Sequence, residues 1–134
     1  MGTVSATMEA LLDQQQTMVF NRILALDRVG GDALLLQEIS VLFIADYPRS
    51  IQEIQDAIKS GDAKALEHAA HGLKGAVSNF AAEPARMAAH QLEDIGRSGN
   101  LQRAPETLKE LVRQFDLLHP MLAAIAQPDV PEKE

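Results

Sequence analysis

A histidine and a lysine three residues apart, His71 and Lys74, are the side chains of this 134-residue chain best placed to do chemistry. An unprotonated imidazole is a nucleophile near neutral pH, because the ordinary pKa of histidine is about 6.5. Residues three apart share one face of a helix, so the Lys74 ammonium can swing over a group attached to the ring. The pair predicts a nucleophilic imidazole with a positive charge ready for an anion.

Two glycines, Gly72 and Gly75, interrupt the segment that carries this pair. Each costs a helix roughly 1 kcal/mol relative to alanine, and neither stands at an evident turn or cap. Gly75 follows His71 by one turn on the same face, where we expect a side chain to crowd the imidazole. The glycines therefore indicate a site cleared for the close approach of another molecule.

The helix around His71 is predicted from about Ala63 to Ala81, with Asp62 as its N-cap. At about 100° per residue, its apolar side chains form one stripe that points away from His71: Leu66, Ala70, Leu73, Val77 and Phe80. His71 is thus expected to face solvent, on a locally basic polar face that also holds Lys64, Glu67, His68, Lys74, Gly75 and Ser78.

Glycines and prolines divide the rest of the chain into further amphipathic segments. Short helices are expected at about residues 7–16 and 19–28, the second with Phe20, Ile23, Leu24 and Leu26 on its apolar face. Longer ones are expected at about 32–59, 84–95 and 105–126. Asp32 is the predicted N-cap of the first of these, and Gly96 and Gly99 close the second. The stripe from Leu36 to Ile58 keeps its phase through Pro48, which favours one kinked helix.

Four longer helices joined by short loops predict an all-α, antiparallel four-helix bundle, capped by the short N-terminal helices. We expect residues 1–126 to form this single domain and residues 127–134 to form a flexible acidic tail.

Composition excludes several classes of function. The formal net charge is −7, from 12 Lys and Arg against 19 Asp and Glu, which argues against a nucleic acid partner. The absence of cysteine excludes disulfides and thiolate chemistry, and fits a reducing compartment. No apolar run is long enough to span a membrane, and the N-terminus does not have the pattern of a secretory signal. We expect a cytoplasmic protein without a membrane partner.

The segment around His71 resembles a known family. His71-Gly72-Leu73-Lys74-Gly75, preceded by Ala69-Ala70 and followed by Ser78-Asn79-Phe80, is similar to the AHxLKG signature of histidine-containing phosphotransfer (HPt) domains. The resemblance covers about residues 19–125 and includes Gly30-Gly31-Asp32, Leu42-Phe43, Tyr47-Pro48, Gly61-Asp62 and Leu92-Glu93.

This resemblance implies that His71 accepts a phosphoryl group from a receiver phospho-aspartate and passes it to another receiver in a two-component phosphorelay. Lys74 matches the lysine that neutralises the phosphate, and Gly75 the small residue beside the histidine. The chain would be a phosphoryl carrier, not an enzyme with its own ATP site. It would have no cofactor or metal of its own, because Mg²⁺ would belong to the receiver.

The implied partners are response-regulator receiver domains, a hybrid sensor histidine kinase, or both, met by a monomer. The expected contact surface is an exposed apolar patch around His71, on its own helix and its neighbours, with six further residues of the histidine helix as candidate partner contacts: Lys64, Glu67, His68, Gly72, Ser78 and Asn79. Ser78 and Asn79 also fit a simple polar helix end. His90 and His119 are expected to be surface or boundary residues without partners of their own.

The sequence departs from the family at Ala76 and Val77, where small or hydroxyl residues are frequent, and at Ala81, where glycine is usual. Ala81 puts the geometry of the helix end in doubt, because alanine disfavours positive φ. Two other functions remain open. One is the phosphoacceptor domain of a chemotaxis-type histidine kinase. The other is a helical adaptor that binds receivers without being phosphorylated.

Overall fold

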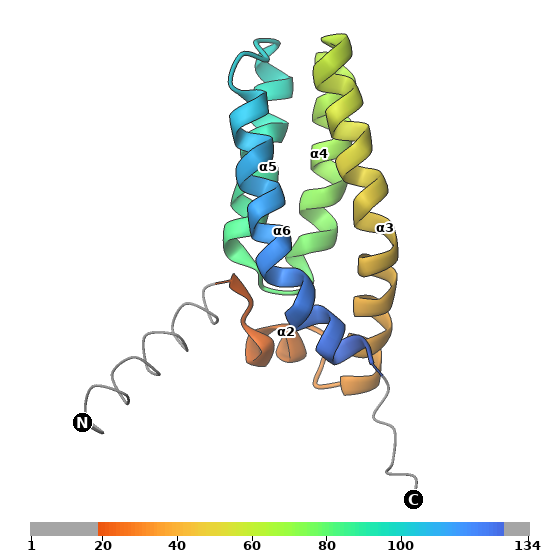
Figure 1. Cartoon of the computed structure of the whole chain (residues 1–134). Coiled ribbons are helices and arrows are strands. Elements are labelled where there is room, and N and C mark those ends of the chain that lie inside the picture. The colour runs from red at the N-terminus through yellow and green to blue at the C-terminus, as the bar shows by residue number, and fades with distance from the viewer. Residues whose placement is uncertain (1–18, 128–134) are drawn as a thin grey trace, which may run out of the picture.

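The computed structural model describes residues 19–127. The helix expected near residues 7–16 and the expected tail beyond Gln127 lie outside this range. The helices of the described part are α2 (Arg22–Arg28), α3 (Ala33–Ser60), α4 (Ala63–Ser78), α5 (Glu83–Ser98) and α6 (Ala104–Ala126). The predicted all-α bundle is confirmed: α3, α4, α5 and α6 run side by side, and α2 lies across one end (Figure 1). No helix between residues 19 and 127 is long and apolar enough to cross a membrane.

The histidine helix is held between two neighbours. α4 packs against α3 on one side and α5 on the other, and α6 closes the ring by packing against both α3 and α5. The predicted stripe of α4 is buried, from Leu66 to Phe80, which confirms that its polar face points to solvent. α4 is therefore fixed in rotation by the core, and this rotation sets the direction of His71.

Aspartate caps begin α3 and the histidine helix α4. Asp32 accepts a hydrogen bond from the Leu35 amide, and Asp62 accepts one from the Ala65 amide, both at 3.0 Å. Each satisfies a first-turn N–H group that has no partner within its helix. Gly61 ends α3 in the left-handed conformation at φ 70°, so α3 and α4 are joined by a tight turn.

Pro48 lies inside α3, which continues through it as one helix, as the sequence predicts. The aromatic residues around this point hold the helix to its neighbours. Phe43 packs on Phe80, just beyond the end of α4, at 5.2 Å between ring centroids, and Tyr47 packs edge-on against Phe115 of α6 at 4.9 Å. Packing on both flanks supports the helix where the proline removes a backbone hydrogen bond.

The expected helix at residues 19–28 is shorter than predicted. α2 begins at Arg22, because the Asn21 side chain accepts a hydrogen bond from the Leu24 amide and caps it there. Ile23 and Leu24 do not join the core: Ile23 is 84% exposed. Phe20 is buried, but it precedes the helix.

α4 also ends earlier than predicted, at Ser78 rather than Ala81. Residues 79–81 form a turn. Ala81 adopts a positive φ of 54°, which alanine disfavours and which explains why glycine is usual at this position. Phe80 lies in this turn and is fully buried, as the apolar stripe predicts. Arg28 of α2 donates a hydrogen bond to the Ser78 carbonyl oxygen and satisfies one of the free carbonyls of this end.

The sequence predicted that Gly96 and Gly99 close α5. Only Gly99 caps the helix, which continues through Gly96 to Ser98. Gly96 is buried against the backbone of α4. A Cβ at this position would lie 2.5 Å from the Glu67 nitrogen and 2.8 Å from the Ala63 oxygen. Its missing side chain is therefore what allows α4 and α5 to approach closely.

Candidate functional site

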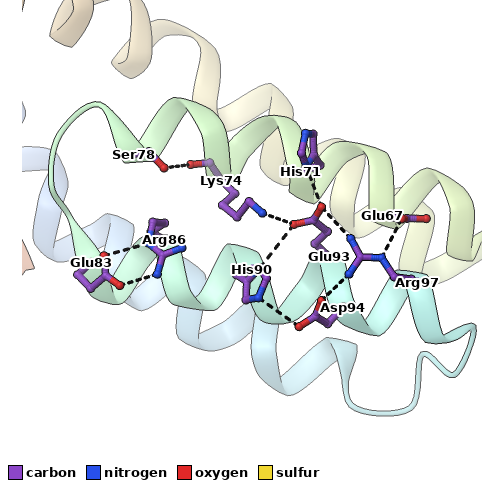
Figure 2. Close-up of polar contacts among 10 residues, drawn as sticks. All are labelled: Glu67, His71, Lys74, Ser78, Glu83, Arg86, His90, Glu93, Asp94 and Arg97. Carbon is purple, nitrogen blue, oxygen red and sulfur yellow. Dashed lines mark hydrogen bonds and ion pairs between the residues drawn. The ribbon is translucent and has the colours of Figure 1, made fainter. Parts of the chain in front are cut away.

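His71 lies in the middle of α4 on the face that borders α5, and 68% of its side chain is exposed. Its Nδ1 atom is 2.7 Å from Oε2 of Glu93, which reaches across from α5 (Figure 2). The imidazole is thus open to solvent and anchored on one edge at the same time.

Glu93 is the centre of the polar contacts that Figure 2 shows. Its side chain is only 5% exposed, and Oε1 lies 2.7 Å from Nζ of Lys74. Arg97 donates to Oε2 from the next turn of α5, at 3.2 Å. Hydrogen bonds from Lys74 and then His71 lower the pKa of Glu93 to about 2, although burial acts in the opposite direction. Glu93 is therefore ionised at neutral pH.

The charge of Glu93 determines how the His71 ring is protonated. An ionised carboxylate can only accept hydrogen bonds, so Nδ1 of His71 must carry the proton in the 2.7 Å contact. The lone pair of the neutral ring is then on Nε2. In this arrangement the free nitrogen is the nucleophilic one.

The sequence of α5 explains how a carboxylate reaches this place. The buried face of α5 consists mainly of small residues: Ala85, Ala88, Ala89 and Gly96. Small residues let two helix backbones approach, so a short reach is enough for Glu93 to contact α4. Arg97 strengthens the pairing, because it also contacts Glu67 of α4 at 3.3 Å, while its 2.9 Å bond to Asp94 stays within α5.

The predicted site residues fall into two groups. Lys64, Glu67 and His68 line an open hollow of about 400 Å³ together with His71, Glu93 and Arg97. Ser78 and Asn79 lie at the end of α4, where the Ser78 hydroxyl donates to the Lys74 carbonyl oxygen at 2.8 Å. The first group surrounds His71, whereas the second forms the polar helix end that the sequence left as an alternative.

Gly72 and Gly75 behave differently from the expectation. Apart from its chain neighbours and the backbone of its own helix, a Cβ at either position would meet no heavy atom within 4 Å, so an alanine at Gly75 would not crowd the imidazole from within the chain. The space beside His71 is open to solvent. Its clearance can therefore matter only for a molecule that approaches from outside.

The other two histidines are half-buried boundary residues, as predicted, but both have partners, which the sequence did not predict. Nδ1 of His90 lies 3.6 Å from Oε1 of Glu93, and Nε2 lies 3.4 Å from Asp94, so His90 belongs to the edge of the site. His119 is 2.7 Å from the Tyr47 hydroxyl and joins α6 to α3.

The sequence of α4 alone predicted a locally basic face around His71, and this prediction was wrong. Three acidic residues balance the cations that lie there: Glu67, Glu93 and Asp94 stand against Lys64, Lys74 and Arg97. Two of these acids, Glu93 and Asp94, come from α5, so the sequence of α4 alone does not reveal them.

The expected apolar patch is not on the histidine helix. In the described part of the chain, the large apolar side chains that remain exposed lie on other helices: Ile23, Leu24, Leu34, Leu35, Val41, Leu42, Met87 and Leu117. Six of these eight are on α2 and the first half of α3. The surface of α4 itself is polar.

Comparison with known proteins agrees with this arrangement. Residues 38–127 match the family model of the Hpt domain. The crystal structure of histidine-containing phosphotransfer protein B (HptB) from Pseudomonas aeruginosa PAO1 is similar, with a TM-score of 0.75 and 26% sequence identity. The match covers 81% of this chain and 95% of that one. Comparison with curated proteins gives no match.

Proposed function

The chain belongs to the Hpt domain family, whose members carry phosphoryl groups on histidine in phosphorelays, and from this premise we propose that its phosphoacceptor is Nε2 of His71. The observation that carries the proposal is the contact between Nδ1 of His71 and the buried, ionised Glu93. This contact leaves Nε2 unprotonated and exposed on a helix face with open space around it.

The proposed reaction needs no proton transfer. The Nε2 lone pair attacks the phosphorus of a receiver phospho-aspartate, and the N–P bond forms as the bond between phosphorus and the carboxylate oxygen breaks. The aspartate leaves as a carboxylate, while the ring keeps its Nδ1 proton and becomes an imidazolium. Transfer onward to a second receiver is the same step in reverse. Positioning and charge neutralisation provide most of the catalysis in such loose transition states.

Lys74 is the cation proposed to neutralise the phosphoryl group. In the free protein its ammonium is paired with Glu93 and its side chain is only 23% exposed. Phosphorylation adds roughly two negative charges near this pair. We expect Lys74 then to share its charge between the carboxylate and the phosphoryl oxygens, since a lysine carries three donors on a flexible stem.

Receiver domains are the proposed partners, and a hybrid sensor histidine kinase is a proposed source of the phosphoryl group. The hollow lined by Lys64, Glu67 and His68 lies directly beside the acceptor, so a receiver that reaches Nε2 must cover it. Gly72 and Gly75 leave room for its loops, and Ser78 and Asn79 are proposed contacts at the far end.

The apolar part of the proposed contact is the set of exposed leucines on α3, the helix against which α4 packs. In this proposal the chain acts as a monomer in the cytoplasm. Mg²⁺ belongs to the acidic pocket of the receiver, and the chain has no cofactor of its own.

The test is transfer from a receiver that has been phosphorylated on its aspartate, with Mg²⁺ present. We expect acid-labile, base-stable label on the wild-type chain and none on His71→Gln. His119→Gln is the matched control, because its glutamine can still bond to Tyr47 far from the acceptor. Label that persists on His71→Gln contradicts the acceptor.

Two other outcomes identify the rival functions. Binding of a receiver without any label supports an adaptor. Label that comes only from a kinase with ATP supports the phosphoacceptor domain of a chemotaxis-type kinase.

A further inference from the structure

The contact between Glu93 and His71 has the geometry to persist after phosphorylation. Nδ1 and Nε2 lie on opposite edges of the imidazole, so a phosphoryl group on Nε2 is directed away from the 2.7 Å bond to Glu93. Lys74 and Arg97 fix the same carboxylate at 2.7 Å and 3.2 Å, and the side chain is 5% exposed. The carboxylate is therefore held in place independently of His71.

The protonation of a phosphohistidine ring decides how it gives up its phosphoryl group. When Nδ1 keeps its proton, the ring is an imidazolium, and it leaves as neutral imidazole when the N–P bond breaks. When Nδ1 has lost its proton, the leaving group is an imidazolate anion, a far poorer one, unless a proton first arrives from water. A group that retains the Nδ1 proton therefore makes the phosphohistidine ready for transfer.

We propose that Glu93 retains the Nδ1 proton of phosphorylated His71, so that the phosphohistidine stays an imidazolium through neutral pH and transfers its phosphoryl group without exchanging a proton with water. This inference rests on the proposed function. In the onward step the N–P bond breaks, its electron pair returns to Nε2, and a P–O bond forms on the receiver aspartate. The Nδ1 proton stays where it is throughout.

The neighbouring charges have opposing effects on this proton. The groups that face the ring from the two helices around it are Lys64, Glu67, His68 and Lys74 of α4 and His90, Glu93, Asp94 and Arg97 of α5. Glu93 alone bonds to the proton directly. Lys74 contacts the other carboxylate oxygen, and Arg97 is 57% exposed, so water screens its charge. The phosphoryl group is itself an anion and acts in the same direction as Glu93.

The consequence is measurable as a titration of the phosphorylated ring. A directly bonded carboxylate shifts such a titration by about one to three pH units. We therefore expect Glu93→Gln to lower the midpoint for phosphorylated His71 by about one pH unit or more. Above both midpoints, each unit lowers the protonated fraction tenfold, so onward transfer should slow by about tenfold or more.

The experiment uses the full chain phosphorylated with phosphoramidate, a small phosphoryl donor that needs no receiver. The ³¹P chemical shift of the phosphohistidine is followed against pH, and His71→Gln identifies the signal. Asp94→Asn is the matched control: it removes one carboxylate from the same helix, and Asp94 contacts Arg97 and His90 but not His71. Glu93→Asp keeps the charge and should restore part of the shift.

Equal midpoints in wild type and Glu93→Gln, or an equal shift in Asp94→Asn, would overturn the inference. If Glu93→Gln does not fold, the wild type alone decides. Its ¹⁵N spectrum should show a protonated Nδ1 on phosphorylated His71 at about pH 8, and an unprotonated Nδ1 there contradicts the inference. These outcomes are separate from the proposed function, which fails instead if no phosphorylated receiver labels His71.

Discussion

Replacing Gly96 with alanine tests whether the close approach of α4 and α5 builds the site. The added Cβ would lie 2.5 Å from the backbone nitrogen of Glu67 and 2.8 Å from its Cα and from the Ala63 oxygen. Ordinary contacts between such atoms are about 3.5 Å or longer, so the two helices must separate by about 1 Å. All three atoms belong to backbone, and no side-chain rotation can relieve the overlap.

Two effects of opposite sign decide the magnitude. Alanine is favoured over glycine inside a helix by about 1 kcal/mol. Overpacking of a well-filled interface costs about 1–3 kcal/mol, and a clash with backbone lies toward the upper end of that range. We therefore expect Gly96→Ala to lower the free energy of unfolding by about 1–2 kcal/mol. Separation of the helices also lengthens the bond between Glu93 and His71, so phosphoryl transfer should slow in the molecules that remain folded.

Urea denaturation followed by circular dichroism measures the first effect, and transfer from a phosphorylated receiver measures the second. Gly72→Ala is the matched control, because a Cβ there meets no atom within 4 Å. Its helix gain is unopposed, so its stability should rise by about 1 kcal/mol. The reasoning is refuted if both variants shift stability in the same direction and by a similar amount.

Four other variants test further parts of the structure. Ala81→Gly should raise the melting temperature by the equivalent of about 1 kcal/mol, because alanine is strained at φ 54°. Gly75→Ala should keep or raise the melting temperature, since its Cβ meets nothing, yet slow labelling by a phosphorylated receiver. Arg28→Ala should lower the unfolding free energy by about 0.5–1 kcal/mol, measured in urea, because it frees a helix-end carbonyl of α4. The pKa of Glu93 is about 2, below its ordinary value of 4.5, so its charge stabilises the fold fully above about pH 4.5 and this stabilisation is lost as the pH falls toward 2. In urea denaturation, the free energy of unfolding should therefore fall less over that window in Glu93→Gln than in the wild type.

The parts of the fold that sequence predicts well are those encoded locally. Asp32 and Asp62 cap helices because a short polar side chain stands directly before an amphipathic run. The continuous α3 follows from an apolar stripe that keeps its phase across Pro48. In these cases the residues that carry the signal are neighbours in the chain.

The end of α4 could not be predicted in this way. No glycine or proline stands between Ser78 and Pro84 to mark a turn, and the helical periodicity continues to Phe80. The chain nevertheless turns at residues 79–81, with Phe80 buried and Ala81 in a conformation that alanine disfavours.

Half of the site was visible in sequence and half was not. His71 and Lys74 reveal each other because they lie one turn apart on one helix. Glu93 is 22 residues from His71, and a helical wheel shows which residues leave the core but not which helices become neighbours. The available signal was an acidic residue beside Leu92 on the apolar face of α5, where an unpaired charge would be costly.

The short distance between the α4 and α5 backbones affects both the free energy and the rate of partner binding. Because Gly96 packs directly on the backbone of α4, Glu93 and the imidazole edge to which it is bonded are held in fixed positions. A partner that docks here does not have to immobilise these groups, so it avoids an ordering cost of about 0.5–1.5 kcal/mol for each such side chain. A surface of this kind can bind weakly and release quickly while still presenting the proposed acceptor nitrogen in the same orientation at every encounter.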